Sequence, residues 1–174
     1  MPSQIPSAAL PLAHLLLRVS IVLNWVAGVA ILVLLLISPH EQWIMSAFKL
    51  TPSPDTSHLI GIMRAIAVFG LVTIPVNHAI LKRLLAMVVS VREGNPFVGA
   101  NSQRLRAIAW AMLVLQVISI IIAALGRMGS TPEHPLHMGN GFSLTGILAV
   151  LLTFLLSSVF AEGAHMREDL DGTV

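Results

Sequence analysis

The sequence predicts an all-α membrane protein, an antiparallel bundle of four transmembrane helices with both termini in the cytoplasm. Hydrophobic residues make up 56% of its 174 positions and charged residues only 10%, whereas soluble domains carry about 25% charged residues. The apolar residues gather in four runs, each close to the ~20 residues that cross the hydrocarbon core of a bilayer. One loop carries half of the lysine and arginine. We therefore expect a single membrane domain over residues 1–174.

The first apolar run covers residues 15–37, with Arg18 near its start and no charge from 19 to 37. It is too long for the apolar core of a signal peptide, and no small-residue cleavage pattern follows it. We therefore expect a retained helix. The other three runs cover residues 59–81, which include Arg64 and Pro75, residues 107–125, and residues 142–160, which hold no charge.

The distribution of basic residues predicts the orientation, because cytoplasmic loops retain lysine and arginine. Seven basic residues fall on one side of the predicted spans: Arg18, Lys82, Arg83, Arg92, Arg104, Arg106 and Arg167. Three fall on the other side or near it: Lys49, Arg64 and Arg127. The loop 82–106 and both termini should therefore lie in the cytoplasm, with the protein in the inner (plasma) membrane of the cell as a multi-pass protein.

Turn-forming residues divide the basic loop 82–106 into two helical parts. The second helix can continue to Gly94, which suits a left-handed position after a helix end, and Asn95-Pro96 then forces a turn. Asn101 or Ser102 is expected to cap the following helix. The tail 161–174 is acidic and lies on the same side. Either it docks on Arg92, Arg104 or Arg106 by charge pairing, or it is a solvated terminus.

Polar residues inside the apolar runs are the first place to look for function in a membrane protein. They are Asn24, Arg64, Asn77, His78 and Gln116. Amides such as Asn24 and Gln116 commonly bond across helices, and His78, one turn before Lys82, fits a packing role near the interface. Arg64 either extends outward to the interface or pairs in a buried site with Glu41, Asp55 or Glu133.

Small residues at four-residue spacing mark two of the runs. They are Thr145, Ala149, Thr153 and Ser157 in the fourth run, and Ala107, Ala111, Ser119 and Ala123 in the third. Such stripes let helix backbones approach closely in lipid. They indicate either packing of spans three and four within one chain or the interface of a homo-oligomer formed through these spans.

The sequence excludes several function classes and predicts no enzyme, no catalytic residue and no cofactor. All eight acidic residues lie outside the apolar cores, which argues against a proton relay at depth. The chain has no cysteine, and no serine–histidine pair or zinc-protease motif lies in the membrane. The pI near 9.9 is explained by juxtamembrane arginines, so no direct nucleic acid binding is expected.

A metal site is a weaker alternative, since imidazole and thioether ligands suit copper or zinc. The outer loops collect the residues that would form it: His40, His58, His134, His137, Met128 and Met138. Histidine is common in polar loops and no regular structure holds these residues, so no metal ligand is assigned.

Two signatures stand out near the predicted cytoplasmic loop and around the fourth span. The first is VREGNPFV at 91–98, followed by Asn101 and RLRAIAW at 104–110, and the second is GFSLTG at 141–146 together with MREDLDGTV at 166–174. With these signatures the chain resembles a family of small bacterial membrane proteins, the domain-of-unknown-function family 2975. The resemblance implies four spans and assigns no catalytic residues. Family members are often encoded beside a small Cro/CI-type helix-turn-helix regulator, which implies a cytosolic partner. The residues expected to bind it are Arg92, Asn95, Pro96, Phe97, Arg104 and Arg106.

Three functions remain open from the sequence. The first is a membrane sensor or tether whose cytoplasmic loop and tail bind a cytosolic regulator. The second is a small oligomeric transporter or channel component, in which Arg64 or Gln116 would matter most. The third is a metal-binding membrane protein. The positions of the family motifs favour the first.

Overall fold

The computed structural model describes residues 9–38, 54–130, 139 and 141–171. In this part of the chain four helices account for almost every residue: α1 Ala9–Ile37, α3 Pro54–Arg92, α4 Gly99–Met128 and α5 Leu144–Asp171. Each is long and apolar enough to cross a membrane. The prediction of an all-α, multi-pass membrane protein is therefore confirmed. α5 begins two residues later than the apolar run 142–160, because Ser143 precedes it as a cap.

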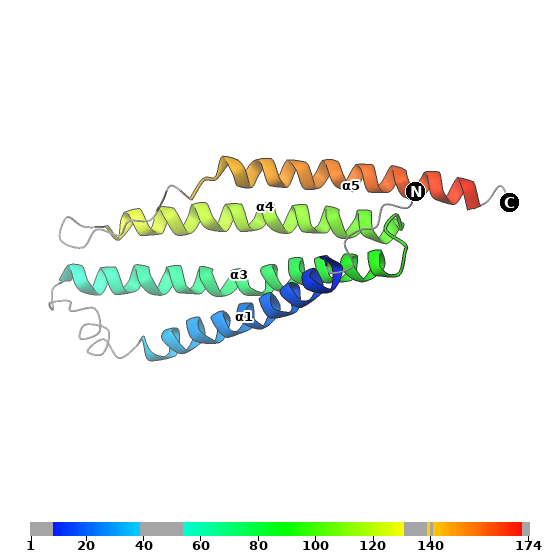
Figure 1. The fold of residues 1–174 in the computed structure, drawn as a ribbon. Coiled ribbons are helices and arrows are strands. Elements are labelled where there is room, and N and C mark those ends of the chain that lie inside the picture. Colours follow the sequence, from blue (N-terminus) through cyan, green and yellow to red (C-terminus); the bar gives the residue numbers. More distant parts are fainter. Residues whose placement is uncertain (1–8, 39–53, 131–138, 140, 172–174) are drawn as a thin grey trace.

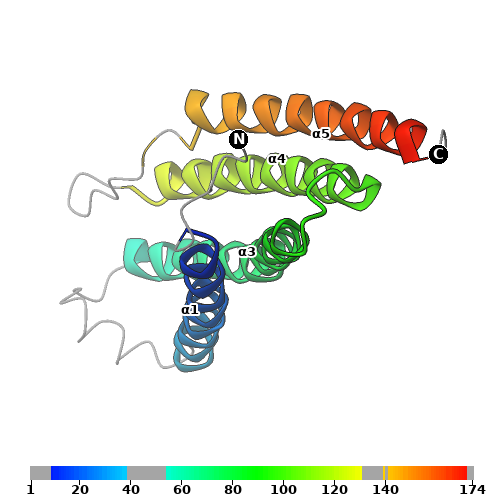
Figure 2. The ribbon, with the colours of Figure 1, turned by 45° about the vertical axis from the view of Figure 1, so that its right-hand side comes forward.

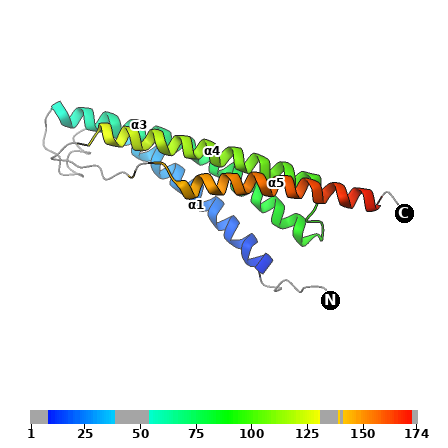
Figure 3. The ribbon, with the colours of Figure 1, turned by 90° about the horizontal axis from the view of Figure 1, so that it is seen from above.

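The helices pack in the order in which they follow one another along the chain. α1 packs against α3, α3 against α4, and α4 against α5. Figures 1 and 2 show the resulting row, in which α1 and α5 lie at opposite edges. Figure 3 shows α1 crossing α3 at an angle, whereas α3 and α4 run side by side. The sequence predicted a bundle, and the four helices form an open row in which each helix packs against its neighbours in the chain order.

Three parts of the chain gather at one end of this row: the start of α1, the junction between α3 and α4, and the end of α5 (Figure 1). We call this end the hairpin end. α3 continues about 16 Å beyond its apolar run 59–81, at a rise of 1.5 Å per residue. α3 thus continues as a helix past its apolar run. The position of Gly94 in the sequence predicted this continuation.

α4 lies between α3 and α5 and has more buried residues than any other helix, whereas α1 packs against α3 and is covered on one side. The buried residues of α4 include Leu105, Ile108 and Ala109. Within α1 only Gly28 is buried, and its leucines and valines are largely exposed. Apolar side chains exposed around a helix are stable in lipid, which is as apolar as they are. The surface thus fits a bilayer.

Candidate functional site

The α3–α4 junction, residues 93–98, begins with a tightly closed helix end. Gly94 has a φ of 77°, a left-handed value that favours glycine. The amide of Gly94 donates to the carbonyl of Val91 at 3.1 Å, and that of Asn95 donates to the carbonyl of Ser90 at 3.0 Å. This pair of bonds is the Schellman motif. The predicted role of Gly94 is confirmed, and α3 ends at a defined place.

Asn101 holds the junction together from inside. It is fully buried, and its amide nitrogen donates to the hydroxyl of Ser90 at 2.7 Å and to the carbonyl of Pro96 at 2.8 Å. Its amide oxygen accepts from Arg104 at 2.7 Å. Because these partners come from α3, the loop and α4, one side chain connects all three segments.

The expectation that Asn101 or Ser102 caps α4 is wrong. Val98 occupies the N-cap position in an extended conformation, and no side chain caps the helix. Asn101 and Ser102 lie inside its first turns, where Ser102 donates to the carbonyl of Gly99 at 2.8 Å. Asn101 serves tertiary packing instead, because its buried amide has better partners in the neighbouring segments than in its own helix end.

The predicted partner-binding residues divide into exposed and structural groups. Arg92, Asn95 and Phe97 are exposed at the hairpin end, whereas Pro96 and Arg104 are half-buried. Pro96 and Arg104 both bond to Asn101 and therefore support the junction. The remaining residue, Arg106, is exposed but lines a groove between α4 and α5. Only the first group lies on the surface that a cytosolic partner would meet.

The tail contacts the junction, but by packing rather than by charge pairing. α5 continues as a helix to Asp171. The rings of Phe97 and Phe160 lie 5.3 Å apart between centroids, and Phe97 covers Gly163 so closely that a Cβ there would lie 2.8 Å from the ring. Arg167 donates to the side-chain oxygen of Asn95 at 2.8 Å.

The charge-pairing version of tail docking is not what the described residues show. In this part of the chain, no ion pair joins Arg92, Arg104 or Arg106 to an acidic residue of α5. The described ion pair of the tail lies within α5, between His165 and Glu168 at 4.0 Å. Aromatic packing on a glycine provides the contact instead, because it can exclude water at an exposed end where ion pairs stabilise little.

Inside the apolar region, Asn24 and His78 connect α1 to α3. The Asn24 amide donates to the carbonyl of Ile74 at 3.0 Å, next to Pro75. The indole nitrogen of Trp25 donates to Nδ1 of His78 at 3.3 Å, with the two rings edge-to-face. These hydrogen bonds satisfy polar groups for which lipid offers no partner. Both residues therefore join helices.

Arg64 also bonds to the neighbouring helix. Its guanidinium donates to the backbone carbonyl of Ser38, just after the end of α1. The last carbonyls of a helix have no partner within it and attract cations. The acidic partners considered from the sequence fall outside the described residues (Glu41 and Glu133) or have an undescribed side chain (Asp55). Arg64 thus ties α3 to the far end of α1.

Gln116 lies in the contact between α4 and α5, at the GFSLTG motif. Its amide donates to the carbonyl of Gly141 at 3.0 Å. Gly141 has a φ of 70° and fits so closely on α4 that a Cβ would lie 2.6 Å from the backbone oxygen of Ser119. Ser143 then caps α5 by accepting from the amide of Gly146 at 3.0 Å.

Members of both small-residue stripes contact neighbouring segments within the chain. The hydroxyl of Ser157 donates to the carbonyl of Ser102 at 3.0 Å, and Thr153 contacts the sulfur of Met112 at 3.8 Å. Ala123 lies against Gly141. Thr145 and Ser119 are exposed at the other end. The packing of α4 on α5 accounts for the buried members of both stripes.

The residues considered for a metal site lie largely outside the described part of the chain, which lacks His40, His134, His137 and Met138. Of the described residues, no three histidine or acidic side chains gather as a metal site would require. The described structure therefore offers no metal or cofactor position to build on.

Two residues matter more in the structure than the sequence suggested. The sequence predicts only a capping role for Asn101, and no motif marks Trp25 as a hydrogen-bond donor to another helix. A polar side chain within the first turn of a helix, five residues after a proline, could have pointed to an internal role for Asn101. No signal in the sequence identifies the carbonyl of Ser38 as the partner of Arg64, since every residue carries such a group.

The comparisons with known proteins agree with the two motifs on which the resemblance rested. No curated protein and no solved structure matches this chain. Residues 44–174 match the family described as "Protein of unknown function (DUF2975)". The match includes the α3–α4 junction with Asn101 and the segment around Gly141, and the chain is a four-span membrane protein belonging to this family of unknown function.

Proposed function

We propose that this protein is a non-enzymatic membrane sensor or tether that binds a cytosolic partner at its hairpin end. The partner we propose is a helix-turn-helix regulator of the Cro/CI type, the pairing that the family resemblance implies. The hairpin end carries the excess of lysine and arginine, which supports a cytoplasmic position in a bacterial inner membrane. Both termini would then also be cytoplasmic.

The observation that carries this proposal is the rigid support of the exposed residues at the junction. Arg92, Asn95 and Phe97 are exposed, yet the segment that holds them is fixed by the buried Asn101 and by α5. A surface that is ordered before binding loses less conformational entropy when a partner arrives. A short loop that only connected two helices would not need such support.

The polar residues of the apolar region favour this function over transport by an oligomer. Asn24, Arg64 and Gln116 each donate to a backbone carbonyl of a neighbouring segment. Side chains used in this way stabilise the helix packing and leave fewer groups to coordinate a passing ion. The transporter interpretation predicts instead that substitutions at Arg64 or Gln116 change flux without changing stability.

The test is affinity capture of the solubilised protein from its native host, comparing the wild type with Arg92→Glu. Arg127→Glu is the matched control, because Arg127 is an exposed arginine at the opposite end of the row. Arg104 is left unchanged, since it bonds to Asn101. We expect a helix-turn-helix protein with the wild type and the control, and none with Arg92→Glu. Capture of the same proteins by all three would refute the proposed surface.

A further inference from the structure

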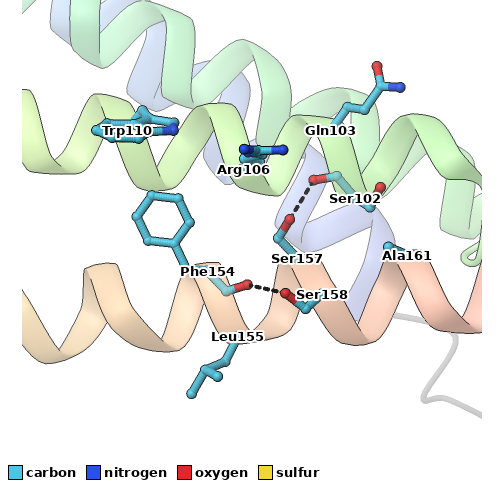
Figure 4. A pocket seen from close by; sticks show the side chains of 9 residues that line it. All are labelled: Ser102, Gln103, Arg106, Trp110, Phe154, Leu155, Ser157, Ser158 and Ala161. Carbon is cyan, nitrogen blue, oxygen red and sulfur yellow. Dashed lines mark hydrogen bonds between the residues drawn. The ribbon is translucent and has the colours of Figure 1, made fainter.

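A groove of about 520 Å³ lies between α4 and α5, close to the hairpin end. Figure 4 shows Trp110 on α4 and Phe154 pointing toward it from α5, with Arg106 about one turn along α4 from Trp110. Gln103 and Leu155 lie at the margins of the groove and point away from the opposite helix (Figure 4). Two aromatic rings therefore line one part of the groove, and a cationic group lines the part about one turn away along α4.

Arg106 is the one charged residue in the lining. It is exposed, and it forms no hydrogen bond or ion pair with another described residue. The hydroxyls beside it are already used as donors, since Ser157 donates to the carbonyl of Ser102 at 3.0 Å and Ser158 to that of Phe154 at 3.3 Å. The guanidinium is thus the cationic group in the lining that is available to an anionic ligand.

The groove lies at the border of the apolar run 107–125, where lipid headgroups are expected. Arg106 immediately precedes the apolar run 107–125, and Trp110 lies about 6 Å deeper by the rise of an α-helix. Arginine at this border and tryptophan one turn inside match the preferred positions of both residues at a membrane interface. The Trp110 and Phe154 rings meet edge-to-face with centroids 5.6 Å apart, and both residues belong to apolar runs.

We propose that this groove binds an anionic phospholipid, with its phosphate on Arg106 and one acyl chain along the Trp110–Phe154 pair. Basic pockets between transmembrane helices at the cytoplasmic interface suit such headgroups, and arginine recognises phosphate through two parallel hydrogen bonds. The unpaired positive charge favours a lipid with net negative charge over a zwitterionic one. This inference does not depend on the partner-binding function proposed above.

A lipid fits the groove better than a second copy of the chain does. A second copy would have to bring a carboxylate to Arg106, and Glu162 is the acidic residue nearest to an apolar run. Glu162 lies one turn beyond Ser158 on α5, is exposed, does not line the groove and does not pair with Arg106. Headgroup phosphate is the anion that a bilayer supplies at this border without a second chain.

The experiment is native mass spectrometry of the full chain in detergent micelles containing phosphatidylglycerol or phosphatidylethanolamine with identical acyl chains. The variants are Arg106→Gln and Arg106→Lys, and the matched control is Arg127→Gln, an exposed arginine at the other end of α4. A further variant, Ser158→Phe, fills the groove and leaves Arg106 unchanged, so the test does not rest on one substitution. Glycerol 3-phosphate is added as a competitor without acyl chains.

We expect one phosphatidylglycerol retained per chain, with at least about tenfold weaker retention by Arg106→Gln, which loses the charged hydrogen bonds to the phosphate. Ser158→Phe should also weaken retention. Arg106→Lys keeps the charge but not the two parallel bonds and should lie between the wild type and Arg106→Gln, whereas Arg127→Gln should retain lipid nearly as the wild type does. Glycerol 3-phosphate should not displace it. Four results would each overturn the proposal. Arg106→Gln and Arg127→Gln could retain the lipid equally, or both lipids could be retained equally. Glycerol 3-phosphate could displace the lipid, or a dimer could be found that disappears with Arg106→Gln.

Discussion

Asn101 illustrates how much of the hairpin end depends on one side chain. Its amide nitrogen and oxygen together bond to Ser90, Pro96 and Arg104, and the residue is fully buried. A buried amide is favourable only while its partners are in place, since an unpaired polar group costs free energy. Asn101 therefore stabilises the α3–α4 junction, and it restricts which substitutions its bonding partners can accept.

Replacing Asn101 by leucine should destabilise the protein strongly. The substitution leaves Ser90, the Pro96 carbonyl and Arg104 without their partner, and we expect a loss of at least about 2 kcal/mol in the free energy of unfolding. Asn95→Ala is the control, because the side chain of Asn95 bonds only at the surface. This substitution should cost less than about 1 kcal/mol. Denaturation in mixed detergent micelles measures both, and equal losses would contradict the role of Asn101.

Gly94 and Gly141 form a matched pair for testing close packing. Both have left-handed φ values, 77° and 70°, but a Cβ at Gly94 would meet nothing within 4 Å, whereas one at Gly141 would meet α4. Gly94→Ala should cost about 1–2 kcal/mol from backbone conformation alone. Gly141→Ala should cost about 1–3 kcal/mol more, from overpacking. The same unfolding assay applies, and similar costs would show that α5 can move away from α4.

At the scale of the helices, α1 is attached along a single face. Gly28 lies against Ile74, where an added Cβ would be 3.1 Å from the isoleucine side chain. Asn24 and Trp25 bond to α3 one turn away, and Arg64 bonds to the far end of α1. Close contact at one glycine, with polar bonds on either side, provides association in lipid, where no hydrophobic effect drives it.

A large residue at position 28 should therefore separate α1 from α3. The chain contains no cysteine, so cross-linking between cysteines introduced at Ile31 and Gly70 reports this packing directly, since a Cβ at position 70 would lie 3.7 Å from the end of the Ile31 side chain. We expect efficient cross-linking with Gly28 and a severalfold decrease with Gly28→Leu. Val29→Leu, on the exposed side of α1, is the control. Unchanged cross-linking in Gly28→Leu would mean that the polar bonds alone hold α1.

At the scale of the whole molecule, the row of helices separates two ends with different charge. The start of α1, the α3–α4 junction and the end of α5 share one end (Figure 1), and most lysine and arginine lie near it. An exposed junction supported from within can present a surface to a partner, while the apolar faces of the row contact lipid. The two proposed sites, for a protein and for a phospholipid, lie at this same end.

The proposed orientation can be tested by labelling single cysteines in intact cells. Arg92→Cys lies at the hairpin end and Arg127→Cys at the other end, and both positions are exposed. With the hairpin end in the cytoplasm, a membrane-impermeant maleimide should label Arg127→Cys in intact cells and Arg92→Cys only after permeabilisation. The opposite pattern would reverse the orientation and remove the support for a cytosolic partner.

The sequence by itself determined the four helices, the end of α3 at Gly94 and the side on which the charge collects. These features depend on residue type along the chain: apolar length, glycine at a left-handed position, and the count of lysine and arginine. Because they need no knowledge of neighbouring helices, they could be predicted without the structure.

Only the tertiary structure decided which groups the polar residues contact. Asn24, Arg64 and Gln116 bond to the backbone carbonyls of Ile74, Ser38 and Gly141, and Asn101 bonds across three segments. A carbonyl is present at every residue, so no sequence pattern distinguishes the one that accepts. The order of the helices in the row, the packing of Phe97 on Gly163 and the groove at Arg106 likewise depend on which surfaces meet in space.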